Sequence, residues 1–462
     1  MNIFDCINQY ADFNKNKIAI SDGKREITYY ELREMIQIDV ERLRKEGYHS
    51  GGKVILKNCG RLEYIVTFLS LLALECWVIP ISNDMTDDEL EKIIRLTEGV
   101  VVENIGISSE VGPTNFKGKL GIHTERCGIL HMTSGSTGEP KFCIRTLKAL
   151  EYEGQSYIST FSLNHTDVLL SGAPLHHSYA LGGAIFPALL GGACLLIINK
   201  FVPRQLLRLV EEYHVTFMLL VPVMAKMLCD MYSIKRFDTS SLRIVLVGAG
   251  SITEDLYNNF LEKYKIYLMS NYGSTETGGL VSRLEPFPVP SIGKVMDGTE
   301  IKLCDEEGRS VQEGQLGEIY VKTKGMFLGY YNNDDVPFDA NGFFPMGDLA
   351  IKDENDYIYI KGRKKLLINA GGKKINPIEV EKIIQEIESV KECVVVGVKK
   401  ANNNEIVKAY VVADSLTKEE IIQYCRTKLS TYKIPGIIEF VSKIPRNSVG
   451  KINRNALMDK EH

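Results

Sequence analysis

The sequence has no Cys-x-x-Cys pair, no signal-peptide pattern in its first residues and no repeat. Its ten cysteines are scattered singly without one Cys-x-x-Cys pair, which argues against a zinc site or a disulfide framework. The N-terminus has no basic region followed by an apolar run, so we expect no signal peptide. The 462 residues contain no internal repeat or low-complexity tract. These absences predict a cytoplasmic, globular protein that is long enough for two or more domains.

A strong charge of either sign is also missing. The net charge of −4 gives no reason to expect nucleic acid or an anionic membrane as a partner. The charge is uneven, because residues 361–462 carry about +8 and the preceding part about −12. A basic C-terminal part would suit a polyanionic ligand, and an ordinary solvated face is the alternative.

One stretch without a charged residue runs from Tyr179 to Ile198. It has about 20 residues, which is long enough to span a bilayer. Two glycine pairs, at 182–183 and 191–192, flank Pro187 within it. This pattern favours a helix, a tight turn and a buried strand over a membrane helix, so we expect no membrane partner.

Strand and helix patterns alternate along most of the chain. Short apolar runs such as 54–56, 77–81 and 217–221 predict buried strands, and amphipathic segments between such runs predict helices. Thr28 and Glu31 have the spacing of a capping box at one helix start. This rhythm predicts an α/β fold in which parallel sheets carry helices on both faces.

The pattern changes near residue 290. Short β segments from there to about residue 352 predict a small β subdomain. After Leu367 a second, smaller α/β unit begins. Asn376 is predicted to cap its first helix, with Glu379 as the capping partner at the third helical position.

A loop rich in glycine and hydroxyl side chains follows the apolar segment 128–132. Glycines allow close approach of the backbone to a ligand, backbone N–H groups and hydroxyls can bind phosphate oxygens, and a lysine adds a positive charge. The loop is not a Walker A motif, because Pro140 stands where that pattern requires glycine. We predict a phosphate-binding loop, with an ordinary surface loop as the alternative. Its residues are Thr133, Ser134, Gly135, Ser136, Thr137, Gly138, Glu139, Pro140 and Lys141.

A second glycine-containing turn invites comparison with a Rossmann dinucleotide site. The apolar run 244–247 ends in Gly248, Ala249 and Gly250. The third glycine of the Rossmann pattern should fall at position 253, which is Thr253, and no acidic residue lies near position 270. Both observations argue against a nicotinamide-dependent dehydrogenase.

The phosphate loop resembles that of the adenylate-forming superfamily, which includes acyl- and aryl-CoA synthetases, peptide-synthetase adenylation domains and firefly luciferase. A second segment resembles the same superfamily: Asn271, Tyr272, Gly273, Ser274, Thr275 and Glu276. The resemblance implies that Thr275 bonds the α-phosphate of ATP and that Glu276 ligates Mg²⁺, which prefers hard oxygen ligands. Taken alone, Glu276 would be read as a surface carboxylate in a glycine-rich loop.

Three further segments match in the expected order. The resemblance places the turn 248–250 beside adenine. It implies that Asp348 accepts both ribose hydroxyls and that Arg363 supports the ribose and phosphate. Lys451 matches a catalytic lysine that would stabilise the charge of the pentavalent α-phosphate. Taken alone, Asp348 would be read as an aspartate in a turn, and Arg363 and Lys451 as solvated cations.

The resemblance also implies a domain organisation. It predicts a large N-terminal domain, residues 1–363, of layered α/β subdomains with a small β subdomain, and a small mobile C-terminal α+β domain, residues 364–462. Lys365 lies where the family hinges the two domains. The loop formed by Gly371, Gly372 and Lys373 resembles one that admits pantetheine, with a plain β-turn as the alternative.

The acid pocket is predicted from His177, Ser178 and Tyr179, which resemble a segment of plant hydroxycinnamate–CoA ligases. Val247 is assigned to the same pocket. Amino-acid-activating relatives carry aspartate at the position of Ser178, and a buried ammonium without a carboxylate is unfavourable. The sequence therefore disfavours α-amino acids and leaves aryl, arylpropenoic and medium-length acyl acids open.

The function implied by the resemblance is ATP- and Mg²⁺-dependent conversion of a carboxylic acid to an acyl adenylate with release of pyrophosphate, followed by transfer to the thiol of CoA. The alternative is a stand-alone enzyme that loads the group onto the phosphopantetheine of a carrier protein. A non-enzyme with the same fold is disfavoured, because Lys451, Glu276 and Asp348 are all present.

Overall fold

The computed structural model describes residues 1–58, 62–102, 124–133, 140–232, 237–282, 291–333, 337–370, 373–399, 405–446 and 452–458. The chain divides into two compact units. The first consists of Met1–Glu300 with Lys322–Phe338, and the second of Ile301–Val321 with Asp339–His462. The domain boundary expected between residues 363 and 364 lies inside the second unit and stays a prediction.

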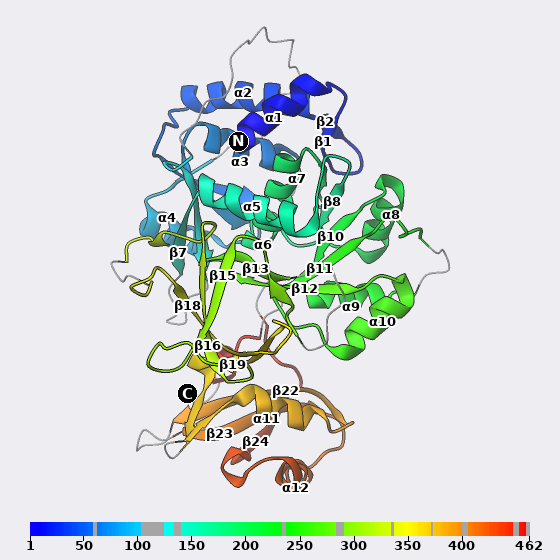
Figure 1. Ribbon diagram of the computed structural model, residues 1–462, viewed down its shortest axis with the longest axis vertical. Coiled ribbons are helices and arrows are strands. Elements are labelled where there is room, and N and C mark those ends of the chain that lie inside the picture. The colour runs from blue at the N-terminus through cyan, green and yellow to red at the C-terminus, as the bar shows by residue number, and fades with distance from the viewer. Residues whose placement is uncertain are drawn as a thin grey trace. The chain divides into compact units, whose positions relative to one another are not determined.

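A nine-stranded sheet forms one layer of the first unit (Figure 1). Strands β12, β11, β10, β8, β9 and β1 are parallel, and the edge strands β2, β13 and β14 are antiparallel. The central strands are aliphatic and buried, as expected for a parallel sheet covered on both faces. In spatial order the strands are β14 (Lys294–Val295), β13 (Gly278–Ser282), β12 (Leu268–Ser274), β11 (Ile244–Gly248), β10 (Phe217–Leu220), β8 (Val168–Ser171), β9 (Cys194–Leu196), β1 (Ile18–Ser21) and β2 (Glu26–Thr28).

A six-stranded sheet forms the second layer of this unit. Strands β5, β3, β4 and β6 are parallel, whereas β7 is antiparallel to β6 and β17 is antiparallel to β7. Strand β17 belongs to the segment Lys322–Phe338, so a late part of the chain completes an early sheet. The order is β17 (Gly329–Tyr330), β7 (Lys141–Thr146), β6 (Gly128–Thr133), β4 (Trp77–Ser82), β3 (Lys53–Asn58) and β5 (Val100–Val101).

One helix of the first unit begins where the sequence predicts a capping box. Thr28 and Glu31 form the expected reciprocal capping box at the start of α2. The helices are α1 (Ile3–Phe13), α2 (Tyr29–Lys45), α3 (Leu62–Ala73), α4 (Asp87–Thr97), α5 (Leu147–Phe161), α6 (Ser178–Ala180), the π-helix η1 (Leu181–Ile185), α7 (Phe186–Gly191), α8 (Pro203–Tyr213), α9 (Pro222–Asp230) and α10 (Glu254–Tyr264).

The uncharged stretch 179–198 folds as short helices followed by a strand. It contains most of α6, then η1 and α7, and after a tight turn β9. Gly192 ends α7 with a φ of +69°, a left-handed conformation that glycine adopts readily. None of the described helices has the length and apolar character needed to cross a bilayer.

The second unit begins with the predicted small β subdomain, a four-stranded sheet in the order β15, β16, β18, β19, in which the β16–β18 and β18–β19 pairs are antiparallel. The short helix η2 (Lys364–Leu366) follows it. The strands of the sheet are β15 (Thr299–Cys304), β16 (Gly317–Thr323), β18 (Phe344–Lys352) and β19 (Ile358–Arg363). The remaining elements are β20 (Ile368–Ala370), β21 (Lys373–Ile375), α11 (Pro377–Gln385), β22 (Val390–Lys399), β23 (Glu405–Ala413), α12 (Lys418–Lys428), η3 (Thr431–Lys433), β24 (Ile437–Phe440) and α13 (Asn455–Met458).

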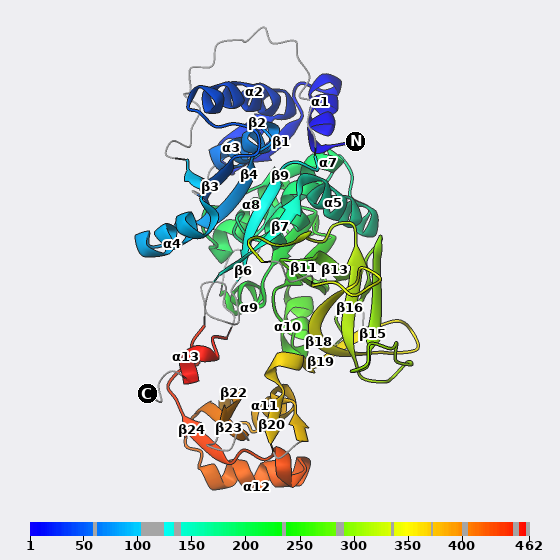
Figure 2. The same cartoon turned by 90° about the vertical axis from the view of Figure 1, so that its left-hand side faces the viewer.

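The C-terminal part of this unit has its own core around the sheet β22-β23-β24 (Figure 2). Alternate residues of a strand face opposite sides of a sheet. Val395 packs into a cluster with residues of α11 and α12, such as Ile384 and Ile421. Val394 and Val396 pack into a second cluster that includes Leu457 of α13. The strands are therefore buried on both faces, as the apolar sequence of β22 indicates.

One local prediction is wrong. Asn376 caps α11, as expected, by accepting a hydrogen bond from the N–H of Ile378. Glu379 does not return to the cap, because its carboxylate binds the ammonium of Lys433 at 2.6 and 2.8 Å. A charged partner far along the chain thus replaces the local hydrogen bond that the spacing predicts.

Candidate active site

The two described ends of the predicted phosphate loop face each other across β6 and β7. Thr133 is opposite Lys141 in the antiparallel pair, and the Thr133 hydroxyl donates a hydrogen bond to the Lys141 carbonyl at 3.3 Å. The loop must therefore leave and re-enter the sheet at adjacent positions. Residues Ser134, Gly135, Ser136, Thr137 and Gly138 lie outside the described residues.

Glu276 lies in the tight turn between β12 and β13. The N–H of Ser274 donates to the hydroxyl of Thr277 at 3.1 Å, and the N–H of Glu276 donates to the hydroxyl of Ser274 at 3.2 Å. The hydroxyls therefore satisfy the turn's own N–H groups. Gly273 is needed for a different reason, since a Cβ there would lie 1.9 Å from the Gly278 carbonyl oxygen.

The segment Lys322–Phe338 forms hydrogen bonds with this turn. The Phe327 N–H donates to the Glu276 carbonyl at 2.7 Å, and the Tyr330 hydroxyl donates to Glu276 Oε1 at 2.9 Å. Lys141 Nζ lies 5.1 Å from the centroid of the Tyr330 ring. One tyrosine thus contacts both the predicted phosphate lysine and the predicted metal-binding carboxylate. Tyr330 was not predicted from the sequence, because no local motif marks it.

The side chain of Asn271 is buried and contacts other residues of the protein. Its Oδ1 accepts a hydrogen bond from the Tyr157 hydroxyl at 2.6 Å, and its Nδ2 lies 3.6 Å from Met296 Sδ. Tyr272 and Thr275, in the same segment, are partly exposed. The neighbouring residues are therefore more accessible to a ligand than the buried Asn271 side chain.

A buried ion pair, also missed from the sequence, braces the same turn. Arg145 Nη2 lies 2.8 Å from Glu153 Oε2, and both side chains are buried. Glu153 Oε1 accepts the N–H of Gly279 at 2.9 Å, and Arg145 Nε donates to the Gly325 carbonyl at 3.1 Å. The pair therefore joins β7 and α5 to the β12–β13 hairpin and to the segment that carries Tyr330.

The predicted adenine turn follows the end of β11. Ala249 has a φ of +62°, an unusual conformation for a residue other than glycine. Gly248 packs against the Tyr179 ring so closely that a Cβ would lie 2.7 Å from Tyr179 Cζ, while Gly250 is exposed. Val247 lies in the apolar cluster of the sheet, together with Met218.

A buried histidine supports the predicted acid-pocket segment. His131 on β6 is 4% exposed, and its Nε2 lies 2.7 Å from the His176 carbonyl oxygen. Burial and the nearby His177 lower the pKa of His131 to about 3, so its ring is neutral and Nε2–H donates. His177 precedes α6, and its ring centroid lies 4.3 Å from that of His176. The signal that could have identified His131 is that it is a polar residue within the apolar run 128–132.

The second unit brings two of the predicted nucleotide residues together. Asp348 and Arg363 are opposite each other on β18 and β19, with Arg363 Nε 3.7 Å from Asp348 Oδ1. Lys365 is exposed in η2, and Lys373 Nζ lies 4.2 Å from the centroid of the Tyr432 ring. Gly371, Gly372 and Lys451 lie outside the described residues.

Comparison with known proteins gives these observations a context. A family model described as AMP-binding enzyme matches residues 119–331, and one described as AMP-binding enzyme C-terminal domain matches residues 379–451. 4-Coumarate-CoA ligase 1 of Narcissus pseudonarcissus is 31% identical to the chain, over 80% of this chain and 71% of its own length. The chain belongs to the AMP-binding enzyme family.

Other members of this AMP-binding enzyme family are also similar. A long-chain-fatty-acid–CoA ligase of Escherichia coli O157:H7 is 32% identical, over 73% of this chain and 62% of its own length. The crystal structure of ATP-bound MatB from Rhodopseudomonas palustris is 25% identical and has a TM-score of 0.87, with 100% of this chain and 99% of that chain covered. The predicted superfamily resemblance and the predicted α/β fold class are confirmed.

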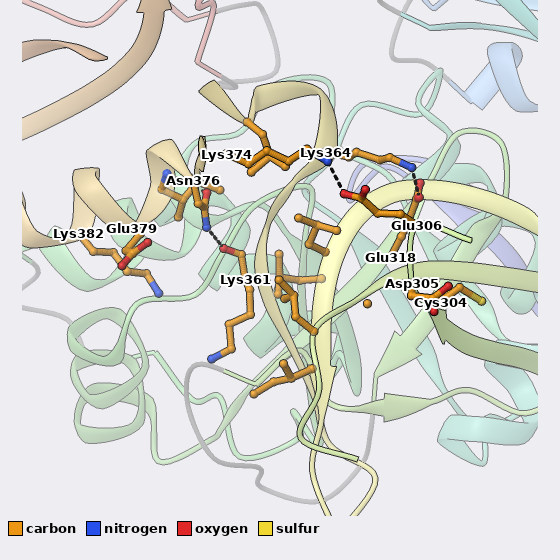
Figure 3. A pocket seen from close by; sticks show the side chains of 17 residues that line it. Cys304, Asp305, Glu306, Glu318, Lys361, Lys364, Lys374, Asn376, Glu379 and Lys382 are labelled. Carbon is orange, nitrogen blue, oxygen red and sulfur yellow. Dashed lines mark hydrogen bonds and ion pairs between the residues drawn. The ribbon is translucent and has the colours of Figure 1, made fainter. Parts of the chain in front are cut away.

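A cavity of about 710 Å³ in this AMP-binding enzyme lies within the second unit, beside β16, β18, β19 and α11 (Figure 3). Its lining includes the apolar Leu349 and Ile351 and several charged side chains. Lys364 Nζ lies 2.6 Å from Glu318 Oε2, and Lys374 forms an ion pair with Glu306. Neither Asp348 nor Arg363 lines this cavity, so it is separate from the predicted ribose site.

Glu276 suits Mg²⁺ as the family resemblance implies. Its carboxylate is a hard oxygen ligand, and Tyr330 holds one of its oxygens. Among the described residues no group of three or more His, Cys, Asp or Glu side chains could hold a metal ion by itself. Mg²⁺ commonly binds through one or two carboxylates, substrate phosphates and water, so a site built around Glu276 would use ligands from the nucleotide.

Proposed function

We infer that this chain is an AMP-forming acid–CoA ligase. It converts a carboxylic acid and ATP to an acyl adenylate and pyrophosphate, and then transfers the acyl group to the thiol of CoA. The observation that carries this proposal is the convergence of Lys141 and Glu276 on Tyr330. A cation for phosphate oxygens and a carboxylate for Mg²⁺ are the pair that adenylate chemistry requires.

Each predicted residue has a role in this proposal. The loop 133–141 binds the phosphates of ATP, Thr275 bonds the α-phosphate, and Glu276 holds Mg²⁺. Asp348 and Arg363 bind the ribose and phosphate. Lys451 stabilises the charge that develops on the α-phosphate, because a positioned ammonium acts most strongly where charge grows in the transition state.

The remaining predicted residues serve the second half-reaction. The domain 364–462 turns about Lys365 between the two steps, and the loop 371–373 admits the pantetheine arm. The net charge of about +8 over residues 361–462 suits the phosphates of CoA. Lys365→Pro would fix φ and remove an N–H at this hinge, so we expect it to impair one half-reaction and spare the other. Equal rates to wild type in both would move the hinge elsewhere.

The acid is a carboxylate without an α-amine, and aromatic acids fit better than aliphatic ones. The described acid-pocket segment carries Ser178 where an ammonium would need a carboxylate, and the ring of Tyr179 offers a flat wall. The relatives include ligases named for 4-coumarate and for long-chain fatty acids, so the choice between these acids rests on the pocket.

Pyrophosphate release with ATP, Mg²⁺ and a panel of acids tests the reaction. The panel contains hydroxycinnamic, benzoic, straight-chain and α-amino acids, and each active acid is then supplied with CoA or with a phosphopantetheinylated carrier protein. We expect acyl-AMP and pyrophosphate with an aromatic acid and a thioester with CoA. ADP and phosphate would contradict the reaction class, an α-amino acid preference would contradict the pocket assignment, and transfer to the carrier protein alone would replace CoA as the acceptor.

Lys451→Ala separates the two half-reactions. We expect it to slow adenylation by about two to three decades, since one preorganised charge is lost at the transition state. Transfer from preformed acyl-AMP to CoA should change much less. Equal losses in both steps would assign Lys451 to folding or general binding.

The proposed compartment is the cytoplasm. The nine described cysteines are free thiols, which suits a reducing environment.

A further inference from the structure

Tyr330 contacts two groups of opposite charge that the proposed function assigns to one nucleotide. We propose that Tyr330 is a positioning residue that holds the Glu276 carboxylate and the Lys141 ammonium in place before Mg²⁺ and ATP bind. The identity of these ligands rests on the proposed function. The positioning itself rests on contacts within the first unit.

The sheet register places the residues concerned on one face. Tyr330 is opposite Cys143 in the β17–β7 pair, and Lys141 precedes Cys143 by two positions on the same strand. Directly paired residues of antiparallel strands share a face, as do residues two apart on a strand. The side chains of Lys141, Cys143 and Tyr330 therefore project together toward the turn that carries Glu276.

The Tyr330 side chain is itself held in place. The Phe327 ring meets it edge to face, with centroids 5.0 Å apart and planes at 70°. Phe327 is buried, and its N–H donates to the Glu276 carbonyl at 2.7 Å. The backbone of the Glu276 turn and the hydroxyl that contacts its carboxylate are thus fixed by the same short segment.

The hydroxyl of Tyr330 is an uncharged hydrogen-bond donor to the carboxylate. It lies 2.9 Å from Glu276 Oε1, and Tyr330 is opposite the buried Cys143 in the β17–β7 pair. A neutral donor orients a carboxylate without competing with Mg²⁺ as strongly as a lysine or arginine would.

This arrangement gives Lys141 and Glu276 a shared neutral partner. If the two side chains instead formed an ion pair, that pair would have to break before phosphate oxygens and Mg²⁺ could replace each partner. Groups held in their bound positions need less reorganisation on binding. Tyr330 has two separable parts in this respect, because its hydroxyl contacts Glu276 and its ring lies against Lys141.

Two substitutions separate these parts. Tyr330→Phe keeps the ring beside Lys141 and Phe327 and removes only the hydroxyl, whereas Tyr330→Leu removes both. Tyr331→Phe is a matched control, since the Tyr331 hydroxyl accepts a hydrogen bond from Lys53 at 2.8 Å and Lys53 Nζ lies 5.1 Å from its ring centroid. The control removes a similar tyrosine–lysine contact at the next residue.

Equilibrium binding of ATP by the full chain, without acid, is measured by calorimetry at a series of Mg²⁺ concentrations. We expect Tyr330→Phe to raise the Mg²⁺ concentration for half-maximal ATP binding about tenfold, in line with one lost hydrogen bond to a charged group, and to leave Mg²⁺-free binding unchanged. Tyr330→Leu should also weaken Mg²⁺-free binding about threefold to fivefold, because the ring no longer holds Lys141. Tyr331→Phe should match the wild type.

The outcomes separate this inference from the proposed function. Identical Mg²⁺ dependence in wild type and Tyr330→Phe overturns the role of Tyr330 alone. The same shift in Tyr331→Phe also overturns it, because the effect would then be general to this strand. If the wild type shows no Mg²⁺-dependent ATP binding and no acid-dependent pyrophosphate exchange, the proposed function falls and this inference falls with it.

Discussion

The Arg145–Glu153 pair of the first unit and the Lys374–Glu306 pair of the second have similar chemistry in opposite environments. The side chains of Arg145 and Glu153 are 0% and 2% exposed, and those of Lys374 and Glu306 are 56% and 73% exposed. The buried pair also binds main-chain groups of Gly279 and Gly325, whereas water surrounds the exposed pair. Breaking a buried ion pair costs much free energy, because it leaves a charge without a partner inside the protein. Breaking an exposed pair costs little, because water replaces the lost partner.

This difference in burial indicates how each unit contributes to the proposed ligase. In the first unit, the buried Arg145 and Glu153 side chains hold the turn of Glu276 through their hydrogen bonds to Gly325 and Gly279. In the second unit, the ion pairs around the cavity and the Asp348–Arg363 contact are partly exposed. The Lys364–Glu318 and Lys374–Glu306 pairs join residues of the proposed mobile domain, 364–462, to the β subdomain, and exposed pairs of this kind would suit the rearrangement proposed between half-reactions.

Removing one partner of the buried pair should have the largest effect. Arg145→Met leaves Glu153 without its cation in a buried place, and we expect the free energy of unfolding to fall by about 3–5 kcal/mol. Trp77 is the single tryptophan of the chain and lies on β4, so its fluorescence during urea unfolding reports on the first unit.

The double variant Arg145→Met with Glu153→Gln is the control for this loss. It removes the uncompensated charge, so it should recover a large part of the stability. A loss below about 1 kcal/mol for Arg145→Met alone would show that the pair does not brace the hairpin, and the contrast between the two units would disappear.

The buried carboxyl of Glu151 makes the stability of the first unit depend on pH. Its carboxyl accepts the N–H of Ile3 at 2.8 Å, and burial raises its pKa from 4.5 to about 7. Between pH 4.5 and 7 the folded chain therefore binds this proton more tightly than the unfolded chain. The protonated carboxyl adds to the free energy of unfolding below pH 4.5, and this contribution, about 3 kcal/mol, is lost as the pH rises through 7.

Glu151→Gln should flatten that part of the pH dependence. Unfolding followed by Trp77 fluorescence at pH 5 and pH 8 gives the difference for wild type and variant. We expect the variant to lose relatively little stability across the interval. An equal slope in both proteins would mean that another group titrates there.

The exposed pair should give the smallest effect. Lys374→Ala is expected to change stability by less than about 1 kcal/mol, because exposed ion pairs are screened and solvated. Hydrogen exchange of the β21 amides, with and without 1 M salt, measures the local change. Lys382→Ala, which alters another lysine at the rim of the same cavity, is the matched control. A loss above about 2 kcal/mol, specific to Lys374, would make this pair as rigid as the buried one.

Local spacing in the sequence predicted the parts of the fold that depend on neighbours along the chain. The capping box at Thr28 forms because Thr28 and Glu31 lie within one helical turn. Glu379 departs from its predicted partner because Lys433 approaches from a distant segment. Helix and strand alternation was sufficient for the α/β class, since it reflects burial of each element separately.

The candidate site was predicted where a motif supplies several side chains in a row. Glu276 and Lys141 were found this way. Tyr330, Arg145 and His131 were missed because their roles arise only when β17, β7 and β6 pair, and no local pattern encodes that pairing. The sequence indicated the groups proposed to meet the ligand, and the structure adds the groups that hold them.

The return of Lys322–Phe338 to the first unit has a consequence for how the protein is made. Strands β6 and β7 leave the ribosome long before β17, so the six-stranded sheet stays incomplete until Tyr330 has emerged. By then Ile301–Val321 has also been synthesised and must wait for partners on the sequence beyond Asp339. A fragment ending at Glu300 would keep Lys141 and Glu276 but lose Tyr330. The shortest N-terminal fragment with a complete first unit ends at Phe338.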